Sequence, residues 1–213
     1  LITTYARIDG WSVGVIANQR KVVKSKSGEM QFGGVIYGDA ADKATRFIAN
    51  CNQRKIPLVF LQDVTGFMVG TKAEHGGIIK DGAKMVNAVA NSVVPKFTIV
   101  VGNSFGAGNY AMCGKAYDPR LILAWPTAKM AVMGGSQAAN VLLQIEKSAA
   151  KKSGVKVDEK KEIALREKIN KHYENKTDIM YAASQLWIDA VIDPIETRSW
   201  ISMGIDTVSY THL

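Results

Sequence analysis

The fold of this chain is indicated by one stretch, Phe97-Thr98-Ile99-Val100-Val101-Gly102-Asn103-Ser104-Phe105-Gly106-Ala107-Gly108-Asn109-Tyr110. Its first five residues are rich in β-branched and aromatic side chains, and small residues follow before the apolar pattern resumes. This order predicts a strand, a tight turn and a helix. Small residues let backbone N–H groups approach a ligand closely, and the N-terminus of a helix favours negative charge. We therefore expect an anion or oxyanion site at this turn.

A second stretch, about 40 residues upstream, repeats this plan at a spacing that suits one strand–helix–strand unit. An apolar strand beginning at Leu58 enters a loop that contains Gly66 and Gly70. A helix is predicted from near Gly77 to before Pro95, because apolar residues recur at spacings of three and four. In a parallel sheet both loops lie at the carboxyl ends of adjacent strands, where open α/β sheets bind ligands. The sequence thus predicts two loops that line one pocket.

The remaining predicted elements alternate between strands and helices, which indicates an α/β domain with largely parallel strands. Residues 21–34 form a polar excursion, and Asp39 is the expected N-cap of the first helix. The other expected strands are residues 11–17, 121–124, 129–133 and 190–192, and the other expected helices are residues 39–52, residues 136–146 and a last one near Pro194.

Composition limits the class of protein. With 213 residues, of which 47% are hydrophobic, the chain can bury a full core as one domain. No segment reaches 18 consecutive apolar residues, so no membrane span is expected. Cys51 and Cys113 lie in apolar contexts, which argues against a disulfide framework and favours a reducing compartment. Metal-ligand spacings are absent, and no metal site is expected. The start lacks a methionine and a signal-like segment, so we expect the middle of a longer polypeptide.

The formal net charge of +8 is concentrated at residues 147–176, where lysines alternate with carboxylates. Such a segment can be a surface for phosphates or nucleic acid. It can also be a solvated helical hairpin, which the interspersed carboxylates and scarce aromatic residues favour. We therefore expect a hairpin and no nucleic-acid partner, with some general attraction for a polyanionic ligand such as a nucleotide-bearing thioester.

Three chemistries compete for the glycine-rich turn. Residues 102–106 match G-x-S-x-G, so Ser104 is a candidate nucleophile of a serine hydrolase, with His172 or His212 as the base. Residues 106–111 match the dinucleotide fingerprint G-x-G-x-x-A, but the expected acidic residue about 20 positions later is missing. The third is a backbone oxyanion hole, which needs no side-chain nucleophile and accounts for two glycine-marked loops.

Six ordered motifs give the chain a family resemblance. It resembles the carboxyltransferase β subunit of biotin-dependent acyl-CoA carboxylases, most of all the methylcrotonyl-CoA carboxylase β subunits. The resemblance covers nearly the whole of residues 1–213. The motifs are FLQDVTGFMVG at residues 60–70, KDGAKMV at 80–86, GAGNY at 106–110, WP at 125–126, VMGG at 132–135 and IDP at 192–194.

The resemblance implies a crotonase-like (ClpP/crotonase) α/β fold, a superhelix of ββα units, which we prefer to a doubly wound sheet. It implies that residues 1–213 are the C-terminal carboxyltransferase domain of the family's subunit, with the charged hairpin at about 147–176. The expected partners are an N-terminal carboxyltransferase domain, a biotin carboxylase or biotin carrier subunit that holds the biotin, an acyl-CoA, and further copies of the subunit. The expected location is the cytoplasm, or the mitochondrial matrix in a eukaryote.

The activity that the resemblance implies is carboxyl transfer from carboxybiotin to an acyl-CoA. The backbone amides of Ala107 and Gly108 would receive the negative charge of the biotin ureido oxygen, and the Phe67 carbonyl would accept from the biotin N1–H. Gly66 and Gly106 complete the expected biotin contacts, and Thr65, Met68, Val69 and Gly70 form the expected acyl-CoA region. A sodium-pumping decarboxylase subunit, which runs the transfer in reverse, is the alternative within the family.

Overall fold

Two strand–strand–helix units form the centre of the computed structural model, which describes residues 1–25, 28–152 and 159–210. In both units a strand of the large sheet is followed by a short strand of a second sheet and then by a helix. Their long strands pair in parallel, and so do their short strands. The second unit therefore lies beside the first and runs in the same direction, as expected for a superhelix of ββα units. They consist of β2 (Trp11–Ala17), β5 (Val35–Ile36) and α1 (Gly38–Gln53), and of β6 (Leu58–Val64), β7 (Gly66–Phe67) and α3 (Ile78–Ala90).

The large sheet has the strand order β1-β2-β6-β8-β9-β11, and β10 also pairs with β8. Only the first pair is antiparallel, and the other pairs of this sheet are parallel. The long central strand has β9 beside its first half and β10 beside its last three residues. The strands not yet bounded are β1 (Ile2–Ile8), β8 (Lys96–Phe105), β9 (Leu121–Ala124), β10 (Lys129–Ala131) and β11 (Ala190–Val191).

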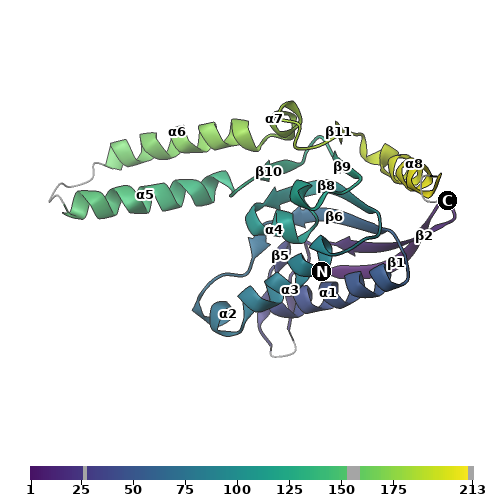
Figure 1. Cartoon of the computed structure of the whole chain (residues 1–213). Helices are drawn as coiled ribbons and strands as arrows, with labels where there is room; N and C mark the ends of the chain where they lie inside the picture. Colours follow the sequence, from purple (N-terminus) through teal and green to yellow (C-terminus); the bar gives the residue numbers. More distant parts are fainter. Residues whose placement is uncertain (26–27, 153–158, 211–213) are drawn as a thin grey trace.

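Helices cover both faces of this sheet, as Figure 1 shows. On one face, buried Ile16 and Phe60 belong to one core cluster with residues of α1 and α3 and with Ala111 of α4 (Gly106–Ala111). On the other face, buried Val59 and Phe97 form a second cluster with residues of α8 (Thr197–Tyr210). Successive residues of a strand point to opposite faces, so the neighbours Val59 and Phe60 serve different cores.

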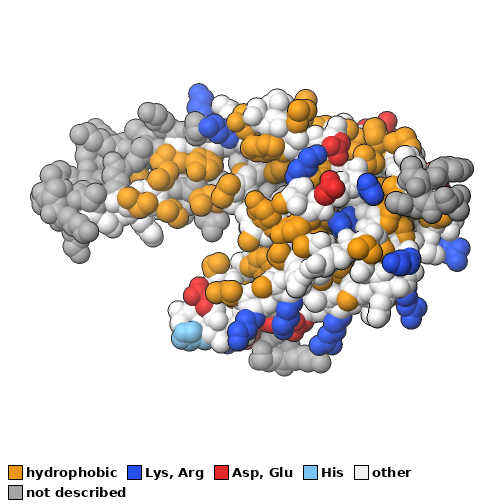
Figure 2. Space-filling model, in the orientation of Figure 1, with side chains coloured by type: hydrophobic (Ala, Val, Ile, Leu, Met, Phe, Trp, Pro, Cys, Tyr) orange, Lys and Arg blue, Asp and Glu red, His pale blue; other side chains and the backbone are white. Residues whose placement is uncertain are grey.

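The predicted charged hairpin is a pair of long helices that projects from the sheet (Figure 1). It consists of α5 (Gly135–Lys152) and α6 (Glu159–Thr177), followed by the short α7 (Ile179–Ser184). One helix spans residues 136–146 and the first part of the predicted hairpin, so the boundary expected near residue 147 is wrong. Figure 2 shows hydrophobic side chains at the surface of this arm. The exposed apolar residues of the arm include Val141, Leu142, Ile145 and Ile163. The hairpin is therefore less uniformly polar than its charges indicate.

Three further expectations need correction. Residues 102–105 are the end of β8 rather than a turn, because β10 pairs in parallel with residues 103–105. Asp39 lies in the first turn of α1, where its charge suits the helix dipole, and the N-cap is Tyr37.

The polar excursion predicted at residues 21–34 contains a small antiparallel pair of strands. Its strands are β3 (Val23–Lys24) and β4 (Met30–Gln31), and the remaining short elements are α2 (Thr71–His75) and the 3-10 turns η1 (Lys115–Tyr117) and η2 (Pro194–Glu196).

Among the described residues, no helix has the length and apolar character needed to cross a membrane.

Candidate functional site

β8 ends at Phe105, and α4 begins directly at Gly106. The φ of Gly106 is +52°, and a Cβ there would lie 2.9 Å from the carbonyl oxygen of Val132, so both the backbone and the space require glycine. The helix that follows has no side-chain cap at Phe105. Its first-turn N–H groups therefore lack acceptors within the helix and side-chain capping from Phe105. Ala107 is exposed at this helix start, while Gly108 is buried.

The two glycine-marked segments contact each other. A Cβ at Gly108 would lie 2.5 Å from Cγ2 of Val64 and 3.2 Å from Cα of Gly66. Gly108 is therefore needed for the close packing of α4 against the end of β6 and the start of β7, and its φ is not positive. At Gly66 the φ is +144°, and a Cβ would meet nothing within 4 Å. The site thus has a close backbone contact on one side and open space on the other.

The backbone of the β6–β7 loop is held by the first strand–strand–helix unit. The N–H of Thr65 donates to the Gly34 carbonyl at 2.8 Å, and the N–H of Met68 donates to the Ile36 carbonyl at 2.9 Å. The Phe67 ring packs over Gly82 of α3, where a Cβ would lie 3.1 Å from the ring. Of the predicted acyl-CoA region, Thr65, Val69 and Gly70 are exposed and Met68 is half-buried. Half-buried Gly66 and Phe67 separate Thr65 from the other three residues.

A cavity of about 780 Å³ opens beside the exposed side of α4. Gly106 and Ala107 line it on one side, and Tyr181 and Trp187 line it on the other. None of residues 65–70 lines this cavity. The expectation that both loops line one pocket is therefore wrong for this cavity, because the α6–α7 region, rather than the β6–β7 loop, forms its opposite wall.

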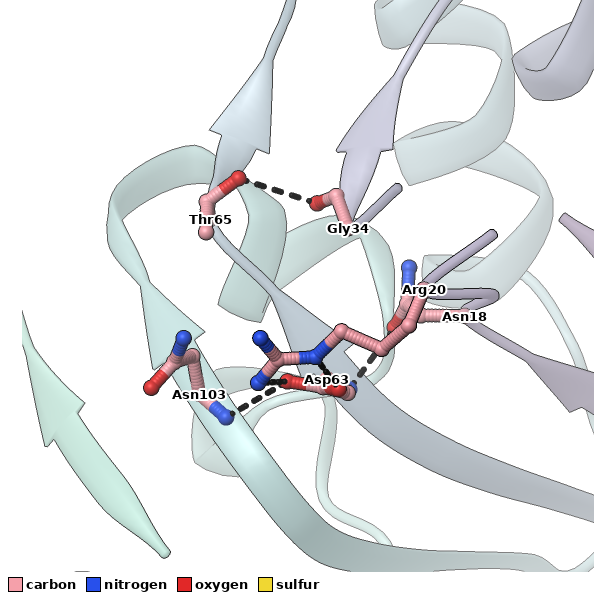
Figure 3. Close-up of polar contacts among 6 residues, drawn as sticks. All are labelled: Asn18, Arg20, Gly34, Asp63, Thr65 and Asn103. Atoms are coloured by element: carbon pink, nitrogen blue, oxygen red, sulfur yellow. Dashed lines mark hydrogen bonds and ion pairs between the residues drawn. The ribbon is translucent and has the colours of Figure 1, made fainter. Parts of the chain in front are cut away.

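Asp63 of β6 links its strand to the segment after β2 and to β8, as Figure 3 shows. Its carboxylate accepts from the Arg20 guanidinium and, at 2.9 Å, from the N–H of Asn103. Its own N–H donates to the Asn18 side-chain oxygen at 3.0 Å. The carboxylate occupies the space that a Cβ at Gly102 would need, which would lie 2.4 Å from Oδ1 of Asp63. The hydrogen bond with this carboxylate raises the pKa of Arg20.

Ser104 is fully buried within β8. Its hydroxyl donates to Oε1 of Gln62 at 2.5 Å and accepts from Nδ2 of Asn109 at 2.7 Å. A serine nucleophile must instead give its proton to a general base and reach the substrate. These contacts of Ser104 argue against the serine hydrolase interpretation. The side chain of His172 and the whole of His212 lie outside the described residues.

Gln62, Asp63 and Arg20 were not predicted as site residues. Gln62 and Asp63 carry a usable signal, since they are polar residues inside an otherwise apolar strand. Arg20 has no such signal in the sequence, because it is one of several basic residues in a polar segment.

Both cysteines are free and buried, as predicted. Burial raises the pKa of the Cys113 thiol to about 11, so the thiol is protonated at neutral pH. Within the part of the chain that the structure describes, no group of three or more His, Cys, Asp or Glu side chains could hold a metal ion.

Comparisons with known proteins define the class of the chain. The model of the family described as "Carboxyl transferase domain" matches residues 1–210. The β subunit of Pseudomonas aeruginosa geranyl-CoA carboxylase has a similar structure, with a TM-score of 0.82, 40% identity, and coverage of 96% of this chain and 36% of that one. The transcarboxylase 12S hexamer has a TM-score of 0.80, 36% identity, and coverage of 98% and 37%. The fold is therefore the crotonase-like fold of carboxyltransferase β subunits.

The chain belongs to the carboxyl transferase domain family. It is 48% identical to the mitochondrial methylcrotonoyl-CoA carboxylase beta chain of Arabidopsis thaliana over 203 residues, which are 95% of this chain and 32% of that protein. It is 42% identical to the biotin-dependent 3-methylcrotonyl-coenzyme A carboxylase beta1 subunit of Mycobacterium tuberculosis, with coverage of 100% and 38%. The chain spans about a third of the length of these relatives.

Proposed function

We propose that the complete protein transfers a carboxyl group from carboxybiotin to an acyl-CoA of the methylcrotonyl-CoA type. In this proposal residues 1–213 are the C-terminal carboxyltransferase domain and supply the biotin side of the active site. The observation that carries the proposal is the meeting of Gly66 with the uncapped start of α4, beside open space and an adjoining cavity. The similarity to methylcrotonoyl-CoA carboxylase beta chains supports it.

The residues at this place fit the flat, polar ring of biotin. Gly66 and Gly106 present no side chain, and Ala107 presents only a methyl group. The N–H groups of Ala107 and Gly108 would donate to the ureido oxygen, whose negative charge grows as the carboxyl group leaves. N1 bears the carboxyl group until the transfer. Once N1 carries a proton again, the Phe67 carbonyl would accept from this N1–H and hold the ring in place. When delivered by its carrier, the carboxylated cofactor supplies the group that is transferred.

The acyl-CoA would approach the β6–β7 loop at Thr65, Met68, Val69 and Gly70, of which all but Met68 are exposed. Its carbon nucleophile then meets the carboxyl group near the β6–β7 loop, and an N-terminal carboxyltransferase domain would complete its site. A biotin carboxylase or biotin carrier subunit would bring the cofactor, and we expect several copies of the subunit to assemble. The expected location is the cytoplasm or, in a eukaryote, the mitochondrial matrix, since the Arabidopsis relative is mitochondrial.

A decarboxylase subunit is the second candidate, and one relative favours it. The chain is 38% identical to the methylmalonyl-CoA decarboxylase subunit alpha of Veillonella parvula. The same donors would serve either direction, because both directions pass through the same charge on the ureido oxygen.

The backbone donors can be tested by Ala107→Pro in a complete subunit that contains this chain, assayed with its biotin-carrying partner. Proline is tolerated in the first turn of a helix but removes the N–H. We expect kcat to fall by about 10²–10³, the usual cost of one oxyanion-hole donor. The matched control is Ala107→Ser, which keeps the N–H and adds one small atom. Wild-type kcat in a correctly folded Ala107→Pro protein would contradict the proposal.

A further inference from the structure

Two polar side chains are completely buried beside the helix that carries the proposed donors. Gln62 of β6 and Ser104 of β8 have no exposed surface, although their strands otherwise supply mostly apolar residues to the cores. Burial of an amide or a hydroxyl is unfavourable unless its hydrogen-bonding groups find partners. The two residues therefore need a structural or functional reason, and their contacts supply one.

The contacts form a series of hydrogen bonds in which each donor and acceptor is fixed. Nε2 of Gln62 donates to the Met112 carbonyl at 2.7 Å, so Oε1 must be the acceptor that faces Ser104. The Ser104 hydroxyl has one proton and gives it to this oxygen at 2.5 Å. Ser104 Oγ can then only accept from Asn109, whose Nδ2 lies 2.7 Å away. Every bond joins neutral groups, and reversing any amide would bring two acceptors face to face.

These hydrogen bonds hold α4 at two points, the Asn109 side chain and the Met112 carbonyl. Asn109 lies within this six-residue helix, and Met112 is its C-cap. Such a short helix is not stable by itself, so tertiary contacts must fix its position and direction. Asn109 is in turn enclosed by Gly114, where a Cβ would lie 2.0 Å from its Oδ1. The side chains of two neighbouring strands thus determine where the first-turn N–H groups of α4 point.

We infer that Gln62, Ser104 and Asn109 are positioning residues that orient the α4 donors for carboxyl transfer. This inference rests on the proposed function, since it assigns those donors to the ureido oxygen. It also gives the G-x-S-x-G pattern a role without nucleophilic chemistry: the serine passes a hydrogen bond from one amide to another. Oxyanion donors stabilise developing charge only when their orientation is fixed before the reaction. Breaking a hydrogen bond of this Gln62–Ser104–Asn109 series should therefore lower kcat while leaving the affinity for the substrate nearly unchanged.

The test compares Ser104→Ala, Asn109→Ala and the double variant in the complete subunit with its biotin-carrying partner. The matched control is Thr98→Val, which removes another buried hydroxyl of β8, one that donates to the Cys113 carbonyl at 2.7 Å. We expect each single variant to lower kcat about five- to tenfold, with KM for methylcrotonyl-CoA unchanged. The double variant should lose little more, because either change breaks the same series of hydrogen bonds. Ser104→Thr should restore kcat by restoring the hydroxyl.

A second measurement does not depend on activity. Hydrogen exchange of the amides in residues 107–111 should accelerate in Ser104→Ala and Asn109→Ala but not in Thr98→Val. Equal kcat losses and equal exchange in Thr98→Val would overturn the inference, because any buried hydrogen bond would then have the same effect. Unchanged kcat in Asn109→Ala, which lies on the half-buried side of the helix, would also overturn it even if Ser104→Ala failed to fold. A loss of about 10⁴ or more in Ser104→Ala would indicate a nucleophile instead.

The failure of this inference is distinguishable from the failure of the proposed function. Suppose that Ala107→Pro lowers kcat but Ser104→Ala and Asn109→Ala do not. The assignment of the α4 N–H groups as donors is then supported, and the positioning role of Ser104 and Asn109 is wrong. If Ala107→Pro keeps wild-type kcat, the donor assignment itself is wrong and the positioning role falls with it.

Discussion

At the scale of single residues, the glycines of this site are required for different physical reasons. Gly106 is required by its φ of +52°, whereas Gly108 is required by the approach of Val64 and Gly66. Gly102 is required by the carboxylate of Asp63, which lies where a side chain would be. The sequence predicts that small residues matter at this stretch, but it cannot separate these reasons. The reasons for Gly102 and Gly108 depend on atoms of residues 63–66, which are about 40 residues away in the sequence.

The role of Asp63 leads to a prediction about Gly102. In Gly102→Ala the new Cβ would overlap the Asp63 carboxylate, which Arg20 and the Asn103 N–H hold in place. We expect the complete subunit to lose about 1–3 kcal/mol of stability, the usual cost of overpacking. The measurement is the denaturant midpoint and slope for unfolding of this domain. Gly134→Ala is the control, because its Cβ would meet only an ordinary contact at 3.8 Å. Equal midpoints for the two variants would show that the carboxylate can move aside.

At the scale of elements, the strand–helix pattern of the central stretches was predictable because hydrophobic periodicity is a local property. The strand over residues 11–17 and the helix over residues 39–52 lie within one residue of β2 and α1 at each end. The extension of β8 to Phe105 was not predictable, since it depends on pairing with β10. For the same reason the short β5 and β7, which are two residues each, have no recognisable pattern of their own. They are strands because each pairs with the other.

The last helix gives a prediction at this scale. Ile205 of α8 is 1% exposed and belongs to the same buried cluster as Val13 and Phe97. Ile205→Ala should cost about 2–5 kcal/mol, because it removes buried methyl and methylene groups and leaves a cavity in the second core. Met203, on the same helix, is 50% exposed, so Met203→Ala should change stability by less than about 0.5 kcal/mol. Chemical denaturation of both variants compares them directly. A similar small loss for both would mean that α8 contributes little to this core.

At the scale of the whole molecule, exposed apolar side chains lie at the proposed site and on the projecting arm. Val69 and Val132, which lie in the two regions of the proposed site, are 71% and 81% exposed. Ile145 and Ile163 add exposed apolar surface on the projecting arm (Figure 2). Contiguous exposed apolar surface is typical of interfaces. The sequence could indicate the family through its six motifs. It could not place this surface, because the exposure of each residue depends on the packing of the complete fold.

This surface leads to a prediction for the chain by itself. We expect the isolated 213-residue chain to show no carboxylation of methylcrotonyl-CoA when it is supplied with carboxybiotin. The chain spans about a third of the length of its relatives, and the site proposed here holds only the biotin side. Without a second wall, the acyl carbon is not held beside the carboxyl group, and the large advantage of proximity is lost. Product formation would be followed by mass spectrometry of the acyl-CoA.

The experiment needs a control for folding, because an unfolded chain would also be inactive. Cooperative denaturant unfolding of the isolated chain would show that its two cores have formed. The complete subunit with its carrier serves as the positive control for the assay. If a folded chain carboxylates the acyl-CoA at a rate near that of the complete subunit, then residues 1–213 contain both halves of the active site. The run from Thr65 to Gly70 would in that case hold the thioester without help, and the exposed valines would have to be part of its binding surface rather than of an interface.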